Sequence, residues 1–208
     1  MSYTVQNVVF PAERDPDILP LYVDPETWAT VDDVPVRLSQ RAHMSNVLSR
    51  GSARFLPGRR VSFATYFNAF PASYWQHWTN VREVTLRIRT SGPGTVLVYR
   101  SNGQGISQRV ESREVVGDAT TTLTLPLSTF GDGGWYWFDI MADDEPLTFT
   151  RGEWSVEVDP VRAGKASLGI TTFNKPTYCV ETLRALSENP DVLAVLDRVF
   201  LTDQGTDR

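Results

Sequence analysis

The sequence predicts a mainly β protein: an antiparallel β-sandwich or jelly roll, followed by the first β-α-β unit of a truncated α/β domain of the mononucleotide type. Two observations support this fold class. Short stretches of alternating apolar and polar residues, separated by turns rich in glycine and proline, fill most of the first 160 residues. That pattern is typical of antiparallel sandwiches. Beyond Pro160 the pattern changes to strand, helix and strand, which is typical of a parallel sheet.

The N-terminal half contains both the weakest and the clearest strand patterns. We expect a strand within residues 3–10, a loop over 11–35, where Asp and Pro are frequent, and a long excursion over 37–58. Residues 84–89 then alternate aliphatic with polar side chains, and residues 95–100 resume this pattern after a Ser-Gly-Pro-Gly turn. We predict that these last two strands form an antiparallel hairpin.

Further strands follow with the same alternation. Residues 120–127 alternate Thr and Leu, and residues 135–140 carry bulky side chains on both faces, which favours a central strand. Two short strands are expected at 147–149 and 154–158. We therefore assign residues 1–163 to an N-terminal β-sandwich domain.

Residues 164–208 are predicted to open a second domain. Residues 166–173 form the first strand, and residues 198–202 form the second. Between them, a helix is expected to begin near Pro176, and three apolar residues of this helix lie on one face: Val180, Leu183 and Leu186. A parallel sheet of two strands needs further strands and cover on both faces. We therefore expect the chain to be truncated inside an α/β domain.

Composition excludes several classes of protein. The 208 residues carry a formal net charge of −5, which argues against a nucleic-acid partner, because such binding depends on Lys and Arg. A single cysteine, Cys179, allows no intrachain disulfide, and with His43 and His77 it is too little for a closed zinc site unless carboxylates complete it. No apolar run approaches the roughly 20 residues of a membrane span. The first residues lack the pattern of a signal peptide, so we expect a cytoplasmic protein.

The ends of the two C-terminal strands carry the candidate binding residues. In an open α/β sheet, ligands bind beyond the carboxyl ends of the strands. Thr172 and Lys175 follow the first strand, and Gln204 follows the second. The Lys175 cation, beside a helix N-terminus, suits a phosphate, and the Gln204 amide suits a nucleobase or sugar. Ordinary turn chemistry explains the same residues, so both interpretations stay open at this point.

Aromatic side chains are frequent in the predicted sandwich. They are compatible with a surface that stacks on carbohydrate or with a hydrophobic core, and we favour the core because aromatic side chains dominate burial in such sheets. The set consists of Tyr66, Tyr74, Trp75, Trp78, Trp135, Tyr136, Trp137 and Trp154. The acidic pairs at 32–33 and 143–144 are interpreted as solvated turns rather than metal ligands.

Several sequence blocks resemble one family. Residues 61–75, VSFATYFNAFPASYW, closely resemble the N-terminal domain of the polymerising galactofuranosyltransferases of mycobacterial-type cell-wall galactan. Residues 133–140 resemble a second block of that domain. Residues 169–176 and 203–205 resemble the opening of the catalytic domain of the same family. The resemblance covers essentially the whole chain and is weakest before residue 60.

The resemblance implies a function for the family as a whole. Its members transfer galactofuranose from UDP-galactofuranose to a lipid-linked galactan acceptor and invert the anomeric centre. They use a divalent metal, Mn²⁺ or Mg²⁺, held by an Asp-x-Asp motif and a histidine, with an aspartate as general base. They form homotetramers and associate peripherally with the cytoplasmic face of the inner membrane. Their fold is an N-terminal β-sandwich, a catalytic domain that binds the nucleotide-sugar, and C-terminal helices.

The resemblance also assigns roles to individual residues. Lys175 falls at a basic donor-binding position where the family has Arg, Gln204 falls at a donor-binding glutamine, and Thr172 completes the predicted UDP-sugar set. Lys keeps the charge of Arg but not its planar fork. No catalytic residue and no metal ligand is assigned within residues 1–208, because these are expected after residue 208. The chain alone is therefore expected to be inactive. The alternative is a non-catalytic carbohydrate-binding or oligomerisation β-sandwich module.

Overall fold

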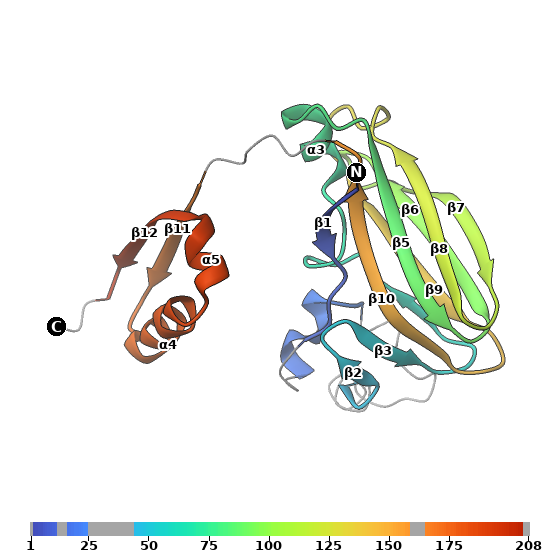
Figure 1. The fold of residues 1–208 in the computed structure, drawn as a ribbon, viewed down its shortest axis with the longest axis horizontal. Coiled ribbons are helices and arrows are strands. Elements are labelled where there is room, and N and C mark those ends of the chain that lie inside the picture. Colours follow the sequence, from blue (N-terminus) through green and yellow to red (C-terminus); the bar gives the residue numbers. More distant parts are fainter. Residues whose placement is uncertain (1, 12–15, 25–43, 159–164, 206–208) are drawn as a thin grey trace. The chain divides into compact units, whose positions relative to one another are not determined.

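The computed structural model describes residues 2–11, 16–24, 44–158 and 165–205, and it divides into two compact units (Figure 1). The first unit is Met1–Asp159 and the second is Pro160–Arg208. The predicted domain boundary between residues 163 and 164 lies outside the described residues.

The larger sheet of the first unit has β10 at its centre. One edge of β10 pairs with β5 along most of its length, and the other edge pairs first with β3 and then with β1, all antiparallel. A register shift between Phe149 and Arg151 explains why the sequence pattern predicted two short strands in place of one long strand. The strands of this sheet are β1 (Tyr3–Asn7), β2 (Val47–Ser49), β3 (Ser52–Phe55), β5 (Glu83–Ser91), β8 (Ala119–Pro126) and β10 (Leu147–Val156).

The smaller sheet has four antiparallel strands in the order β4-β9-β6-β7. They are β4 (Arg60–Ser62), β6 (Gly94–Ser101), β7 (Ser107–Val115) and β9 (Tyr136–Ala142). β9 lies between two neighbours, which confirms the central strand predicted from its bulky side chains. The predicted antiparallel sandwich is confirmed as well, because both sheets contribute side chains to one core.

The predicted hairpin of β5 and β6 was wrong. β5 pairs with β8 and β10, whereas β6 pairs with β7 and β9 in the other sheet. The chain turns this corner at Gly92, where φ is +110° and where a Cβ atom would lie 2.6 Å from the carbonyl oxygen of Pro146. Alternation in the sequence identifies the buried face of a strand, but it does not identify the strand's partner.

Two short helices were not predicted from the sequence. The 3₁₀-helix η1 spans Pro16–Leu21, and α3 spans Ala72–Trp78. Each is too short to show a helical repeat of apolar residues, and prolines lie in or beside both. In the described residues, no helix is long and apolar enough to cross a membrane.

Aromatic rings dominate the core between the two sheets. The Phe63 ring stacks on Phe138 with a centroid distance of 4.4 Å and on Phe149 at 5.6 Å, which joins β9 of one sheet to β10 of the other. The buried polar tips are satisfied: Trp154 Nε1 donates to the carbonyl of Asn68 at 3.2 Å, and the Tyr136 hydroxyl donates to Pro126 at 2.8 Å. Each ring therefore contributes its apolar area without an unpaired donor.

Asn68 fixes the segment between β4 and α3 against the core. Its side chain is fully buried, accepts from the Val9 amide at 2.8 Å, and donates to the carbonyls of Val9 and Tyr22 at 2.9 and 2.6 Å. One amide side chain thereby joins three separate segments of backbone. The conformation of residues 64–69, which line one wall of a cleft described below, depends on this contact.

The second unit is a β-α-β arrangement with parallel strands, as predicted. β11 (Ala166–Thr172) leads into α4 (Pro176–Ser187), α5 (Pro190–Val195) and β12 (Leu196–Asp203), and β11 pairs with β12 in parallel. The predicted buried face of α4 needs one correction, because the Val180 side chain is 52% exposed. Cys179 is buried instead, and Leu183 and Leu186 are half-buried, a spacing of four and then three residues.

Candidate functional site

The predicted UDP-sugar residues lie at the carboxyl ends of the two parallel strands. Thr172 is the register partner of Asp203, and the amide of Gln204 donates to the carbonyl of Thr172 at 2.8 Å. Thr172 and Lys175 also line one shallow pocket of about 200 Å³. The structure therefore brings Thr172 into contact with Gln204 and onto the same pocket as Lys175. The Gln204 side chain is exposed and does not line that pocket.

Lys175 presents an available positive charge. It is the N-cap residue of α4, its side chain is exposed, and its Nζ lies 5.9 Å from the centre of the Tyr178 ring. The ion pairs formed among the described residues do not include Lys175. No side chain caps α4, so the first amides of the helix are without a side-chain partner next to the Lys175 cation.

A tight contact between the two strand ends holds Gln204 in place. Asn174 adopts a φ of +51°, and the amide of Gly205 donates to Asp203 Oδ1 at 2.9 Å. A Cβ atom at Gly205 would lie 2.7 Å from Asn174 Oδ1, so only glycine fits there without displacement of a neighbour. These contacts could not be predicted from the sequence, because they depend on the register of β11 against β12.

The described residues do not form a metal site. In that part of the chain, no group of three or more His, Cys, Asp or Glu side chains is close enough to hold an ion. His77 lies on α3, where its Nδ1 is 2.8 Å from the carbonyl of Ser73, and Asp143 and Asp144 are exposed in a turn. His43 and the acidic pair at 32–33 lie outside the described residues. The donor set described here therefore does not fit the divalent metal that the resemblance implies.

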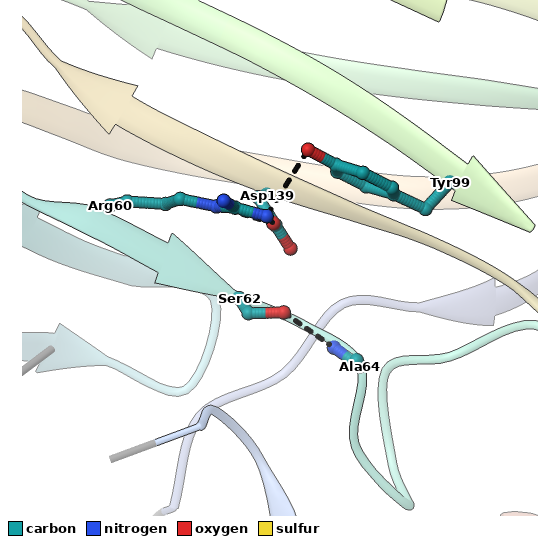
Figure 2. Close-up of polar contacts among 5 residues, drawn as sticks. All are labelled: Arg60, Ser62, Ala64, Tyr99 and Asp139. Atoms are coloured by element: carbon teal, nitrogen blue, oxygen red, sulfur yellow. Dashed lines mark hydrogen bonds and ion pairs between the residues drawn. The ribbon is translucent and has the colours of Figure 1, made fainter. Parts of the chain in front are cut away.

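An ion pair joins the half-exposed Arg60 to the buried Asp139 on neighbouring strands of the smaller sheet (Figure 2). Asp139 on β9 is 1% exposed, and Arg60 on β4 donates to its Oδ2 through Nε at 2.7 Å and through Nη2. Burial raises the pKa of the Asp139 carboxyl, and hydrogen bonds from Ser62 and Arg60 oppose the rise only in part. Arg60 Nη2 also donates to the Tyr99 hydroxyl at 3.1 Å, so the pair orients a tyrosine ring.

The aromatic residues divide between core and surface. Tyr136 and Trp154 are buried, as the core interpretation predicts. Other members of the set are exposed, and that interpretation was wrong for them: Tyr66 at 78%, Trp78 at 76%, Tyr74 at 61% and Trp135 at 45%. For Trp137 the signal was present in the sequence, since successive residues of a strand point to opposite faces and the preceding Tyr136 faces the core.

Some of these exposed rings border a cleft, named here the aromatic cleft. It has a volume of about 410 Å³, and Tyr66, Trp135 and Trp137 line it together with Thr65, Ser101 and two alanines. Trp137 is half-buried and stacks on Tyr99, with centroids 5.7 Å apart and planes 13° from parallel. Sequence analysis did not identify Thr65 or Ser101, since single hydroxyl residues carry no pattern.

Comparisons with known proteins match nearly the whole chain. The profile of the galactofuranosyltransferase 2 N-terminal family matches residues 5–157. Galactofuranosyltransferase GlfT2 of Mycolicibacterium smegmatis is 37% identical over 98% of this chain, and that of Mycobacterium tuberculosis is 36% identical over 97%. The chain spans 30% of the length of each relative. Among solved structures, a mutant of a family 29 carbohydrate-binding module aligns to 53% of this chain and to 78% of the module's own chain. The sequence identity of this alignment is 15%, and its TM-score of 0.33 is too low to establish a relationship.

Proposed function

The chain belongs to the galactofuranosyltransferase 2 N-terminal family, and we propose that it forms the N-terminal part of an enzyme that transfers galactofuranose from UDP-galactofuranose to a growing lipid-linked cell-wall galactan. The observation that carries this proposal is the 37% identity to such a transferase over 98% of the chain. The enzyme is proposed to invert the anomeric centre of the donor sugar.

The second unit is the proposed donor-binding part. Lys175 contacts the diphosphate of UDP, since its exposed ammonium forms no ion pair among the described residues and stands at the uncapped N-terminus of α4. Gln204 offers its side-chain amide to the uracil or the ribose, and its backbone contact with Thr172 keeps both residues at the same strand ends. Thr172 supplies a hydroxyl on the wall of the Lys175 pocket. These groups bind and orient the donor, and none of them is proposed to exchange a proton with it.

The chemical step is proposed to need groups that the described residues do not supply. A divalent metal, Mn²⁺ or Mg²⁺, offsets charge on a departing nucleoside diphosphate, and a base accepts the proton of the attacking hydroxyl. The described residues hold no group of three or more candidate metal ligands, so the metal is proposed to be held by other parts of the enzyme. We expect the purified 208-residue chain to release no UDP from UDP-galactofuranose above a blank without enzyme, in the presence of Mn²⁺ and acceptor. Turnover by this chain would contradict that expectation.

Location and assembly follow from the proposed family role. We propose that the enzyme works as a homotetramer, bound peripherally at the cytoplasmic face of the inner membrane, where a lipid-linked acceptor is accessible. Family membership supports both statements. We further propose that nucleic acid is not a partner, because the chain carries a net charge of −5.

Calorimetric titration of UDP into the 208-residue chain tests the donor site. Removal of one charge-assisted contact to a phosphate costs about 1.5–3 kcal/mol in a well-formed site. For the exposed Lys175 we expect about a tenfold weaker affinity in Lys175→Ala, which corresponds to about 1.4 kcal/mol. Lys165→Ala is the matched control, because Lys165 is an exposed lysine that precedes β11 at its opposite end. Equal affinities of the two variants would remove Lys175 from the site.

A further inference from the structure

The aromatic cleft has the size and composition of a ligand site. It opens where the segment after β4, carrying Thr65 and Tyr66, meets Ser101 at the end of β6 and the tryptophans around the start of β9. Its volume of about 410 Å³ lies within the roughly 300–1,000 Å³ of small-molecule sites, which are mostly apolar with a few polar groups. We propose that this cleft binds a neutral oligosaccharide, independently of the donor site in the second unit.

The ring surfaces suit a sugar. A pyranose or furanose ring has C–H groups that pack on an aromatic face and hydroxyl groups that need hydrogen-bond partners at the edge of that face. Tyr and Trp combine an apolar body with a polar tip and therefore satisfy both needs. Trp135, which directly precedes β9, and Trp137 on β9 both line the cleft, and the Tyr66 side chain beside them is 78% exposed.

The polar lining points to a neutral ligand. Hydroxyl groups of Thr65, Tyr66 and Ser101 and the indole N–H groups of the two tryptophans supply the hydrogen-bonding capacity of the cleft, and none of the described residues that line it is charged. A nucleotide or another anion would find no cation among these residues. The cleft thus differs from the strand ends of the second unit, where Lys175 provides a positive charge.

The cleft is organised before a ligand arrives. The Trp135 amide donates to Ser101 Oγ at 3.1 Å, and the Ser101 amide donates to the carbonyl of Trp135 at 2.9 Å. Gly134 precedes Trp135 with a φ of +125°, and a Cβ atom there would overlap the Ser101 carbonyl oxygen. On the other wall, Thr65 Oγ1 donates to the carbonyl of Tyr22 at 2.9 Å. Fixed walls reduce the entropy that binding would otherwise lose.

The ion pair on the smaller sheet is linked to the cleft through Tyr99. Trp137 stacks on Tyr99, and the Arg60 guanidinium lies 5.4 Å from the centre of the Tyr99 ring, held by the buried Asp139. The orientation of Trp137 is therefore set by a connected group of side chains. This gives the ion pair a positioning role for the cleft.

Binding of neutral oligosaccharides to the 208-residue chain tests the proposal. The probes are a galactofuranosyl, a mannosyl and a glucosyl hexasaccharide, titrated by calorimetry and by tryptophan fluorescence. We expect at least one probe to bind, with affinity about tenfold or more weaker in Tyr66→Ala and in Trp135→Ala. Trp135→Phe, which keeps a ring, is expected to retain most of the affinity. Trp78→Ala, which removes an equally exposed ring outside the cleft lining, is the matched control and should bind as the wild type does.

Several results would overturn the proposal. They are a wild-type chain that binds none of the three probes, an equal loss of affinity in Trp78→Ala, and displacement of the sugar by UDP. A fourth is self-association of the wild type in analytical ultracentrifugation that Trp135→Ala abolishes, since the cleft would then be a contact between copies of the chain. Thermal unfolding of each variant shows whether a lost affinity reflects a lost fold. Because UDP binding depends on other residues, failure here leaves the proposed donor site unaffected.

Discussion

The two units of the chain use apolar residues in opposite ways. In the sandwich, both sheets direct aliphatic and aromatic side chains into one core, and its largest rings are fully buried. Among the described residues of the second unit, Cys179 is the one buried hydrophobic side chain. Large apolar side chains of that unit are exposed instead: Phe173, Tyr178, Val180, Val192, Leu193, Val195, Val199, Phe200 and Leu201.

The difference shows that regular secondary structure does not by itself imply a core. β11 and β12 are paired over their whole length, and Asn189 caps α5 by accepting a hydrogen bond from Val192 at 3.3 Å. Local hydrogen bonds of this kind contribute little net stability in water, because the unfolded backbone bonds to water equally. We therefore infer that the free energy of unfolding of this chain comes mainly from the sandwich.

The largest expected effect comes from a truncation in the sandwich core. Trp154→Ala removes a fully buried ring and a hydrogen bond to Asn68, and it should lower the free energy of unfolding by about 3–5 kcal/mol in urea denaturation. A loss of less than about 1 kcal/mol would contradict the conclusion that the sandwich core supplies most of the stability.

A smaller effect is expected from the buried carboxyl of the sandwich. The pKa of Asp139 is raised by burial above its ordinary value of 3.8, so the unfolded chain loses this proton at lower pH than the folded chain. The stability of the wild type relative to Asp139→Asn is thus expected to be fully present below pH 3.8. It should fall as the pH rises from there through the folded-state pKa. Unfolding curves at a series of pH values measure this difference. Asp197→Asn, which changes an exposed carboxyl of the second unit, serves as the control. Parallel plots of the free energy of unfolding against pH for the wild type and Asp139→Asn would refute the effect.

The smallest effect is expected in the second unit. Phe200 on β12 is 54% exposed, so Phe200→Ser should change the free energy of unfolding by less than about 0.5 kcal/mol. Urea denaturation of wild type and Phe200→Ser measures this change. A loss as large as that of Trp154→Ala would show that the sheet of the second unit is covered in solution, and the contrast between the two units would disappear.

The positions of strands could be predicted from the sequence, but their partners could not. Alternation located β5, β6, β8 and β9 closely, since a half-buried strand must repeat every two residues. It could not show that β5 and β6 belong to different sheets, because both direct one apolar face to a shared core. On α4, a spacing of three residues suggested Val180, whereas the register of the helix on its sheet selected Cys179.

The candidate sites were predictable to different degrees. The carboxyl ends of parallel strands always meet at one edge of a sheet, so the proximity of Thr172 and Gln204 followed from the predicted topology. The aromatic cleft combines residues from the segment after β4, from β6 and from β9, which are far apart in the sequence. Its existence depends on the order of strands in the smaller sheet, which no local pattern specifies.

The passage of the chain from β5 into the opposite sheet has a consequence for the folding rate. The partner of Leu86 in β5 is Trp154 in β10, so most of the sandwich sequence must be synthesised and folded back before this pair can form. Contacts between residues so distant in sequence require closure of long loops, and topologies dominated by them fold on timescales of about milliseconds to seconds. The sandwich should therefore assemble slowly, and β10 should be the last strand of the larger sheet to pair, with β5 as its partner.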